Sequence, residues 1–464
     1  MAARTGFLTR ALAYFGVRRI EAASDRRWTG GASPRFGSYS SETNAVSETV
    51  RAKSRALAVN NPWIANGVAA WSGNTIGAGI VPTSQHPEPE TRKVLDAAFK
   101  RWCATCDLDG RTDFYGLQAG MFRGTVVDGE AFIQFVTEPD GLRLQLIPAE
   151  LIDHAETREL GGGARIIAGI EFDARGRRVA YHVRPLDPSA IWESYAPPVR
   201  VSALDMVQLC RPLGPGQVRG LSWLAPILLR AGELDQLEDA ALVANKVAAM
   251  HAGFLTDQNG AATGFPVDGT QIGSIMESGL EPGTLRVLPS GFDIKFSAPQ
   301  QSAQLIDFAK LQLRGIAAGL GVPEYLLTGD LSNANYSSLR AGLIEFRARI
   351  EAVQFQTLVP QLLQPVWERF IVHAVLTGEI DAPDFEARMP DYFACEWIPP
   401  AQAWVDPEKD AKATAAMIAS GLTSRRRAVA AQGYSVEELD AEIISDRQRE
   451  TGLGLSFGPE TTNA

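Results

Sequence analysis

The 464-residue sequence has few cysteines and no long apolar run. Four cysteines are too few for a disulfide framework in a chain of this length, so we expect folding in a reducing, intracellular compartment. No run of 18 or more uncharged apolar residues occurs and no secretory signal pattern is found, so no membrane partner is expected. The hydrophobic share of 45% and the charged share of 21% are ordinary for a globular protein. We therefore predict a soluble chain that needs no disulfide or metal.

Motifs of common catalytic chemistry are also missing. The sequence contains no G-x-x-x-x-G-K-[ST] phosphate loop, no H-E-x-x-H zinc motif and no G-x-S-x-G nucleophile motif. The "GGGA" string at 161–164 lacks the strand-to-helix context of a dinucleotide loop, which favours a hairpin tip. A Ser-His-Asp site built from distant residues stays open, although no motif supports one. No cofactor and no enzymatic activity are predicted.

The most enzyme-like string is "WCATC" at 102–106. Thiol-disulfide oxidoreductases present such a Cys-x-x-Cys pair at a helix N-terminus, where a thiolate is stabilised. Here Cys103 and Cys106 follow the C-terminal end of an amphipathic helix predicted over 90–102, where the helix dipole raises a thiol pKa. An oxidoreductase using this pair is the alternative function. The cysteines and histidines form no second close pair, which argues against zinc.

Positive charge is in short supply overall but not at the start of the chain. The net charge of -10 disfavours a protein that coats nucleic acid, because such binding relies on Lys and Arg. Residues 1–60 nevertheless hold ten basic and four acidic side chains. Because 29–49 is rich in Gly, Ser and Thr, a flexible basic arm is predicted over 1–49, with order beginning near Val50. An inert terminus and a functional arm are both open.

Turn residues mark antiparallel hairpins in the first half of the chain. "GEAFIQFV" and "LRLQLIP" flank Pro139-Asp140-Gly141, and "IIAGIEFD" and "RRVAYHVR" flank 174–176. Another strand is predicted over 205–210. Helical periodicity then predicts a helix from Ser222, as N-cap, to about Met250. The strands expected after it are "GFLT", "LRVL" and "FDIKF", at 253–256, 285–288 and 292–296.

The second half of the sequence is predicted to be mostly helical. A helix is predicted over 301–320, and a long one that begins near Tyr336 is expected to bend at Pro360 and Pro365. Two or three short polar helices follow, with Gly421 and Gly433 as stops. The class predicted from these patterns is α+β.

One polar stretch, "GVPEYLLTGDLSNANYSSLRAG" at 321–342, separates two apolar-faced helices. Gly321 and Pro323 are expected to end the first helix, and Gly329-Asp330 to form a second turn. Asn335 or Ser337 is expected to cap the next helix. The length of this loop makes a binding or gating role as credible as a mere connection.

This stretch resembles the portal proteins of tailed bacteriophages, in particular the lambda type. The resemblance rests on Gly321-Val322-Pro323, on Leu327 to Asp330, and on "NYSSLR" at 335–340. It departs at Gly214, where the family usually has Arg before Pro-Gly-Gln. Further blocks agree in order across about 50–400: "NNPWIANGVAAWSGNTIGAGI" (60–80), "DGEAFIQF" (128–135), "LQLIPAELID" (144–153), "GIEFDARGRRVAYHV" (169–183) and "GPGQVRGLSWLAPIL" (214–228).

The resemblance implies a ring of about twelve copies at one capsid vertex, through which double-stranded DNA enters and leaves. It implies a multi-region portal fold with an antiparallel-strand wing, long stem helices, a small β clip and a helical crown. The implied regions are an arm (1–49), wing (50–221), stem helix (222–252), clip (253–300), stem helix (301–320), tunnel loop (321–335), wing helices (336–400) and crown with C-terminal tail (401–464).

The resemblance also implies partners and site residues. The clip would meet the terminase large subunit, which hydrolyses ATP, and later the head-tail adaptor; major capsid and scaffolding proteins are further partners. The location implied is the virion, after assembly in the bacterial host cytoplasm. The DNA-channel residues would be Thr328, Asp330, Ser332, Asn333 and Asn335; the structural ones Gly321, Pro323, Gly329, Tyr336, Ser337, Ser338 and Arg340; and the clip contacts Arg286, Asp293 and Lys295.

Overall fold

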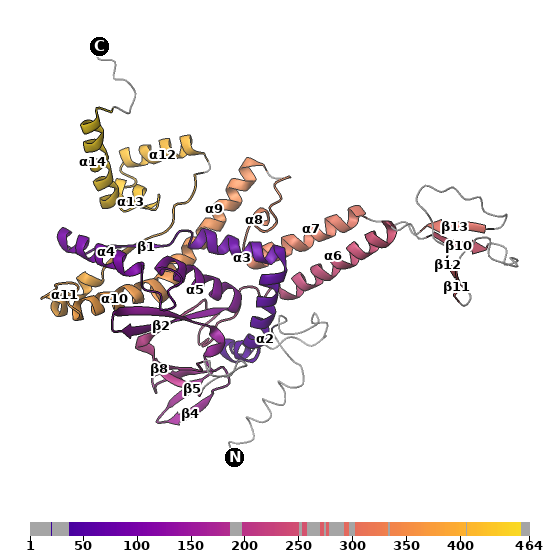
Figure 1. The fold of residues 1–464 in the computed structure, drawn as a ribbon, viewed down its shortest axis with the longest axis horizontal. Coiled ribbons are helices and arrows are strands. Elements are labelled where there is room, and N and C mark those ends of the chain that lie inside the picture. The colour runs from indigo at the N-terminus through magenta and orange to yellow at the C-terminus, as the bar shows by residue number, and fades with distance from the viewer. Residues whose placement is uncertain are drawn as a thin grey trace, which may run out of the picture. The chain divides into compact units, whose positions relative to one another are not determined.

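The computed structural model has mixed helices and antiparallel sheets, in keeping with the α+β prediction (Figure 1). It falls into two compact units, Met1–Leu229 with Leu313–Ala464, and Arg230–Gln312, and each is described by itself. The structure describes residues 20, 37–185, 197–249, 253–257, 270–272, 275–277, 292–296, 302–332, 335–404 and 406–455.

The first unit opens with two helices, α2 (Tyr39–Asn60) and α3 (Pro62–Thr75). Ser38 caps α2 by accepting from the Ser41 N–H, and Asn61 caps α3 by accepting from the Ile64 N–H. The expected start of order near Val50 is therefore wrong, and the arm cannot extend to residue 49. Burial of α2 side chains on both sides of that position outweighs the low helix propensity of the Ser- and Thr-rich segment.

Two antiparallel sheets follow. The first has the order β3 (Gly141–Ile147), β2 (Glu130–Glu138), β9 (Met206–Cys210), and α5 (Phe114–Asp128) packs against β2. The hairpin at Pro139 to Gly141 and the strand near 205–210 are confirmed. The second sheet runs in the order β4 (Arg158–Gly161), β5 (Ala164–Ile167), β6 (Ile170–Phe172), β7 (Arg178–Val183), β8 (Val199–Ser202).

The second sheet refines two predictions. The "GGGA" string is the tip of the β4–β5 hairpin, as expected. "IIAGIEFD" is not one strand, however, because Ala168 and Gly169 both have positive φ, 49° and 81°, and separate β5 from β6. The two sheets share a core that includes Phe132, Ile170 and Tyr181. Two short one-turn helices, Ala149–Leu151 and Ala203–Asp205, connect the strands.

An aromatic core joins two further helices of the first unit. α4 (Pro89–Cys103) contributes Phe99, whose ring meets Trp367 and Phe370 of α10 (Gln364–Leu376) at centroid distances of 5.1 and 5.2 Å. β1 (Val81–Ser84) pairs with β14 (Cys395–Ile398), which the sequence did not predict. α11 (Phe385–Phe393) precedes β14.

A nearly continuous helical segment joins α9 (Tyr336–Val353) to α10. At the first of the two prolines where a bend is expected, the structure has a π-helix, Gln354–Leu363, that contains Pro360. Its wider i→i+5 ladder replaces the α-helical pattern that proline disrupts. Pro365 lies in the first turn of α10, where its missing N–H matters least.

The second unit contains strands between two long helices. α6 (Leu228–Ala249) precedes β10 (Gly253–Asp257), which pairs with β13 (Phe292–Phe296), and α7 (Ser302–Leu320) follows. β11 (Thr270–Ile272) pairs with β12 (Ile275–Glu277). The strand predicted over 285–288 lies outside the described residues.

The predicted start of the first long helix is wrong. Ser222 is buried and its hydroxyl accepts from the Leu224 N–H and donates to the Val126 carbonyl, so it belongs to the turns before α6 rather than to a helix cap. The helix begins six residues later, after Pro226.

Three short helices end the chain: α12 (Pro407–Ala419), α13 (Arg425–Ala430) and α14 (Val436–Leu453). Gly421 and Gly433 stand between them with φ of 73° and 81°, which confirms the predicted stops. Within the described parts of the chain, every helix is too short or too polar to cross a lipid bilayer.

Candidate functional site

The candidate site is the segment between α7 and α9. At its start, the Val322 N–H donates to the Ala317 carbonyl at 3.1 Å and the Gly321 N–H donates to Ala318 at 3.2 Å. This is a Schellman cap, and it requires the left-handed backbone that Gly321 adopts, with φ of 80°. α7 therefore ends where the sequence predicts.

The residues that follow this cap form a short helix and not a loop. α8 (Glu324–Thr328) follows Pro323 and ends at Gly329, which has φ of 70° and donates its N–H to the Tyr325 carbonyl at 2.9 Å. The prediction of one loop over 321–335 is therefore wrong in part, because α8 lies within that range. The Thr328 hydroxyl donates to the Glu324 carbonyl at 2.9 Å inside this helix, so it is already engaged within the chain.

The polar tip of the segment is exposed. The Asp330 carboxylate accepts from both the backbone N–H and the hydroxyl of Ser332, at 2.9 and 2.5 Å, which fixes a local turn. Leu331 between them is 56% exposed. Asn333 lies outside the described residues.

A capping box begins α9. The Asn335 side chain accepts from the Ser338 N–H at 2.8 Å, while the Ser338 hydroxyl accepts from the Asn335 N–H at 3.2 Å. Of the two caps the sequence offered, Asn335 is the one used. Tyr336 and Ser337 are the first two residues of the helix, and Arg340 pairs with Asp410 at 3.6 Å.

α3 holds the base of this segment. The Asn66 side-chain amide donates to the carbonyls of Leu326 and Leu327 at 2.8 and 2.9 Å, and Trp71 Nε1 donates to the Leu320 carbonyl at 3.0 Å. Gly67 lies so close that a Cβ there would be 2.5 Å from the Leu320 side chain. The blocks at 60–80 and 321–330, far apart in sequence, thus form one structural site with a fixed base and an exposed tip.

Ion pairs frame the same segment. Arg314 of α7 pairs with Glu324 at 2.9 Å. Arg349 of α9 donates to the Gly321 carbonyl at 3.2 Å and also pairs with Glu345, as the i,i+4 spacing indicates. The charges near the base are therefore matched in pairs.

A buried ion pair joins two further sequence blocks. Arg219 donates to Glu130 at 2.7 Å, and both side chains are fully buried. Burial raises the pKa of the Glu130 carboxyl, but Arg219, Arg51 and the Gly220 N–H outweigh it and hold that pKa below its ordinary value. The ion pair locks 128–135 onto 214–228 and is structural.

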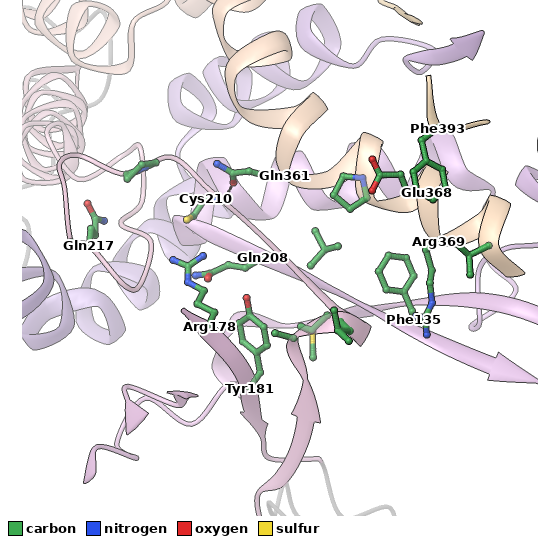
Figure 2. A pocket seen from close by; sticks show the side chains of 18 of the residues that line it. Phe135, Arg178, Tyr181, Gln208, Cys210, Gln217, Gln361, Glu368, Arg369 and Phe393 are labelled. Atoms are coloured by element: carbon green, nitrogen blue, oxygen red, sulfur yellow. Dashed lines mark hydrogen bonds between the residues drawn. The ribbon is translucent and has the colours of Figure 1, made fainter. Parts of the chain in front are cut away.

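A groove of about 890 Å³ lies between β9, the loop after it and α10 (Figure 2). The Arg369 guanidinium lies 5.6 Å from the centroid of the Phe135 ring, and Gln361 accepts from the Cys210 N–H at 3.0 Å. Burial raises the pKa of the Cys210 thiol to about 11, so it is a poor nucleophile. No local sequence pattern predicts this groove, because its walls come from segments more than 150 residues apart.

The cysteine pair is poorly placed for redox chemistry. Cys103 is the last residue of α4, and Cys106 lies in the turn beyond it, with both side chains buried. Burial raises the pKa of both thiols, that of Cys106 to about 12. Among the described residues, no cluster of His, Cys, Asp and Glu is suited to hold a metal ion.

The structure describes two of the three predicted clip residues. In the β10–β13 pair, Asp293 lies opposite Thr256 and Lys295 opposite Phe254. Arg286 lies outside the described residues.

Comparison with known proteins gives consistent matches. The family model "Phage portal protein, lambda family" matches residues 25–354. A probable portal protein of Halomonas phage phiHAP-1 is 27% identical over 429 residues, covering 88% of this chain and 82% of that protein. Portal protein B of Escherichia phage lambda is 22% identical over 478 residues, covering 90% and 89%.

Solved structures are more distant. The neck of a native gene transfer agent particle, computed with C12 symmetry, matches with 15% identity and a TM-score of 0.46, covering 81% of this chain and 91% of that one. An HK97-family phage portal protein from Corynebacterium diphtheriae matches with 14% identity and a TM-score of 0.34, covering 71% and 98%.

Proposed function

We propose that this chain, which belongs to the lambda family of phage portal proteins, forms a ring at one capsid vertex and conducts double-stranded DNA during packaging and ejection. The family match over residues 25–354 supports the proposal most directly. In this account about twelve copies close the ring by cyclic symmetry. The chain itself is structural, and the ATP that drives packaging is hydrolysed by the terminase.

Exposed apolar residues on the proposed stem helices support a ring. Val243 on α6 and Leu311 on α7 are each 58% exposed, and Leu242, Ile306 and Phe308 are about half exposed. Exposed apolar residues on long helices are suited to burial against another copy of the chain. Neighbouring copies in the ring would bury them.

The segment between α7 and α9 is the proposed channel element. Its base is fixed by Asn66 and Trp71, whereas Asp330 and Ser332 stand exposed at the tip. A conduit should not retain DNA, and a polar, acidic tip repels phosphate instead of binding it. We assign Thr328, Asp330, Ser332, Asn333 and Asn335 to the channel lining.

The remaining regions are assigned partners by the same proposal. The β strands between α6 and α7, with Arg286, Asp293 and Lys295, would contact the terminase large subunit during packaging and the head-tail adaptor afterwards. The wing would meet major capsid and scaffolding proteins, and α12 to α14 would form the crown. Assembly would take place in the host cytoplasm, and the mature location would be the virion.

A charge reversal at the tip tests the channel assignment. Asp330→Arg should leave rings intact but lower DNA packaging by on the order of tenfold, because every copy then offers an arginine to phosphate. Asp109→Arg makes the same change on an exposed wing turn and should package normally. Ring assembly is scored by electron microscopy and packaging by protection of DNA from nuclease. If the Asp330→Arg variant packages DNA normally, the assignment of this segment to the channel lining is wrong.

A further inference from the structure

The C-terminal helices, defined as α12 to α14 within residues 406–455, have no core of their own. Each of the three helices lacks any buried residue. Helices of 13, 6 and 18 residues are marginal in water when nothing packs against them. Their position must therefore depend on what they contact in the rest of the first unit.

Ion pairs join the C-terminal helices to the rest of the first unit. Glu437 of α14 lies 3.6 Å from Arg92 of α4, and its neighbour Glu438 lies 3.4 Å from Lys100. A third ion pair, at 3.6 Å, joins Asp410 of α12 to Arg340 of α9. These three pairs join α12 and α14 to α4 and α9, so charge orients these two C-terminal helices against the rest of the first unit.

Arg426 of α13 is the centre of this contact. Its guanidinium lies 3.4 Å from the Glu396 carboxylate of β14 and donates to Gln85 at 3.3 Å. It also pairs with Glu437 at 3.2 Å, the same carboxylate that meets Arg92. Arg426 thus links β14 to α14.

Apolar contact across this boundary is small. Ala430, Tyr434 and Val436 line one small hollow together with Thr83 and Ile398, yet Tyr434 is 57% exposed. Leu422 and Ile444, at 78% and 58% exposure, bury little. Exposed ion pairs are individually weak and are screened by salt, whereas apolar contact is not.

We propose that the C-terminal helices are held by a salt-sensitive ionic latch centred on Arg426, and that raised ionic strength releases them as one group. The hinge is the extended segment 399–404, which has no regular structure. The first unit keeps its own core when the latch opens, because none of that core comes from residues 406–455. The latch makes the C-terminal helices a movable element of the chain.

Hydrogen–deuterium exchange of the full-length protein tests the latch. Between about 0.05 M and 1 M sodium chloride, exchange across 425–450 should rise several-fold while exchange in α5 stays constant. Arg426→Gln should show the fast exchange already at low salt. Arg425→Gln removes the same charge one residue away. Among the residues that the structure describes, Arg425 pairs only with Asp440 inside the C-terminal helices, so the salt response of this variant should match the wild type.

A charge exchange checks that the contact is direct. Lys100→Glu should speed exchange across 425–450 at low salt, and adding Glu438→Lys should restore the wild-type rate. Exchange that is independent of salt would overturn the latch. Equal effects of Arg425→Gln and Arg426→Gln would overturn it too, because they would assign the effect to local helix stability.

Discussion

Arg219 and Glu130 form an ion pair from which solvent is wholly excluded, with 2.7 Å between guanidinium and carboxylate. The same guanidinium donates to the carbonyls of Ile152, Ala168 and Ala149. A buried charge is tolerated only when it is paired and hydrogen-bonded in this way. The pair therefore ties the two antiparallel sheets of the first unit to the segment that leads into α6.

Removing one partner of that pair should be costly. Glu130→Ala leaves Arg219 buried without its counter-charge, and we expect a loss of about 3–5 kcal/mol in the free energy of unfolding. Glu90→Ala breaks the exposed pair with Lys93 and should cost about 0.5 kcal/mol or less. Chemical denaturation of both variants measures the difference. Similar losses for the two would refute the structural role given to Glu130.

Two glycines on α3 provide a matched pair for the site. Gly67→Ala places a methyl group against Leu320 and Leu327 and should cost about 1–3 kcal/mol in the free energy of unfolding while loosening α8. Gly73→Ala, on the same helix, meets no atom within 4 Å and should be neutral or stabilise by about 0.5–1 kcal/mol. Thermal and chemical unfolding distinguish them. If Gly67→Ala is as stable as Gly73→Ala, the base of the site is not tightly packed.

Asp96 should make stability depend on pH. Burial is the main cause that raises the pKa of its carboxyl to about 6; the hydrogen bond from the Ser84 N–H lowers this pKa, and the charges of Glu438 and Glu437 raise it. Because the folded pKa exceeds the unfolded value, this contribution is present below about pH 4 and is lost as pH rises through 6. Asp96→Asn should thus gain up to about 3 kcal/mol over the wild type at pH 7.5 and almost none at pH 4.

The check is unfolding free energy measured across that pH range. Asp109→Asn, on an exposed turn, serves as the control and should show a constant difference from wild type. A constant difference for Asp96→Asn as well would mean that its carboxyl has an ordinary pKa.

The thiols at 103 and 106 should be inert. Because burial raises both pKa values, they should react with a thiol reagent at pH 8 orders of magnitude more slowly in the folded protein than after unfolding. The Cys103→Ser/Cys106→Ser double variant should still form rings. Rapid reaction in the folded protein, with disulfide-exchange activity that the double variant lacks, would favour the oxidoreductase alternative instead.

Local signals in the sequence were the most informative. The Pro-Asp-Gly hairpin, the Gly321 helix end and the Asn335 cap follow from the backbone preferences of those residues, so they were predictable. The start of α2 at Tyr39 was missed because tertiary burial of Val46 and Val50 overrides propensity.

Long-range features were out of reach of pattern analysis. β1 and β14 are four residues each and pair across more than 300 positions, so neither carries a turn signal. The anchoring of Leu326 and Leu327 by Asn66 depends on chain packing in the same way. The resemblance therefore indicated which segment forms the site. The contacts that hold this segment in place are seen only in the structure.

The central claim is that this chain assembles into a ring with an open centre. Negative-stain electron microscopy of the purified full-length protein tests it most directly, with copy number counted by native mass spectrometry. The account predicts closed rings of about twelve copies around a central hole. Particles that stay monomeric at every protein and salt concentration tried, with no central hole, would contradict it.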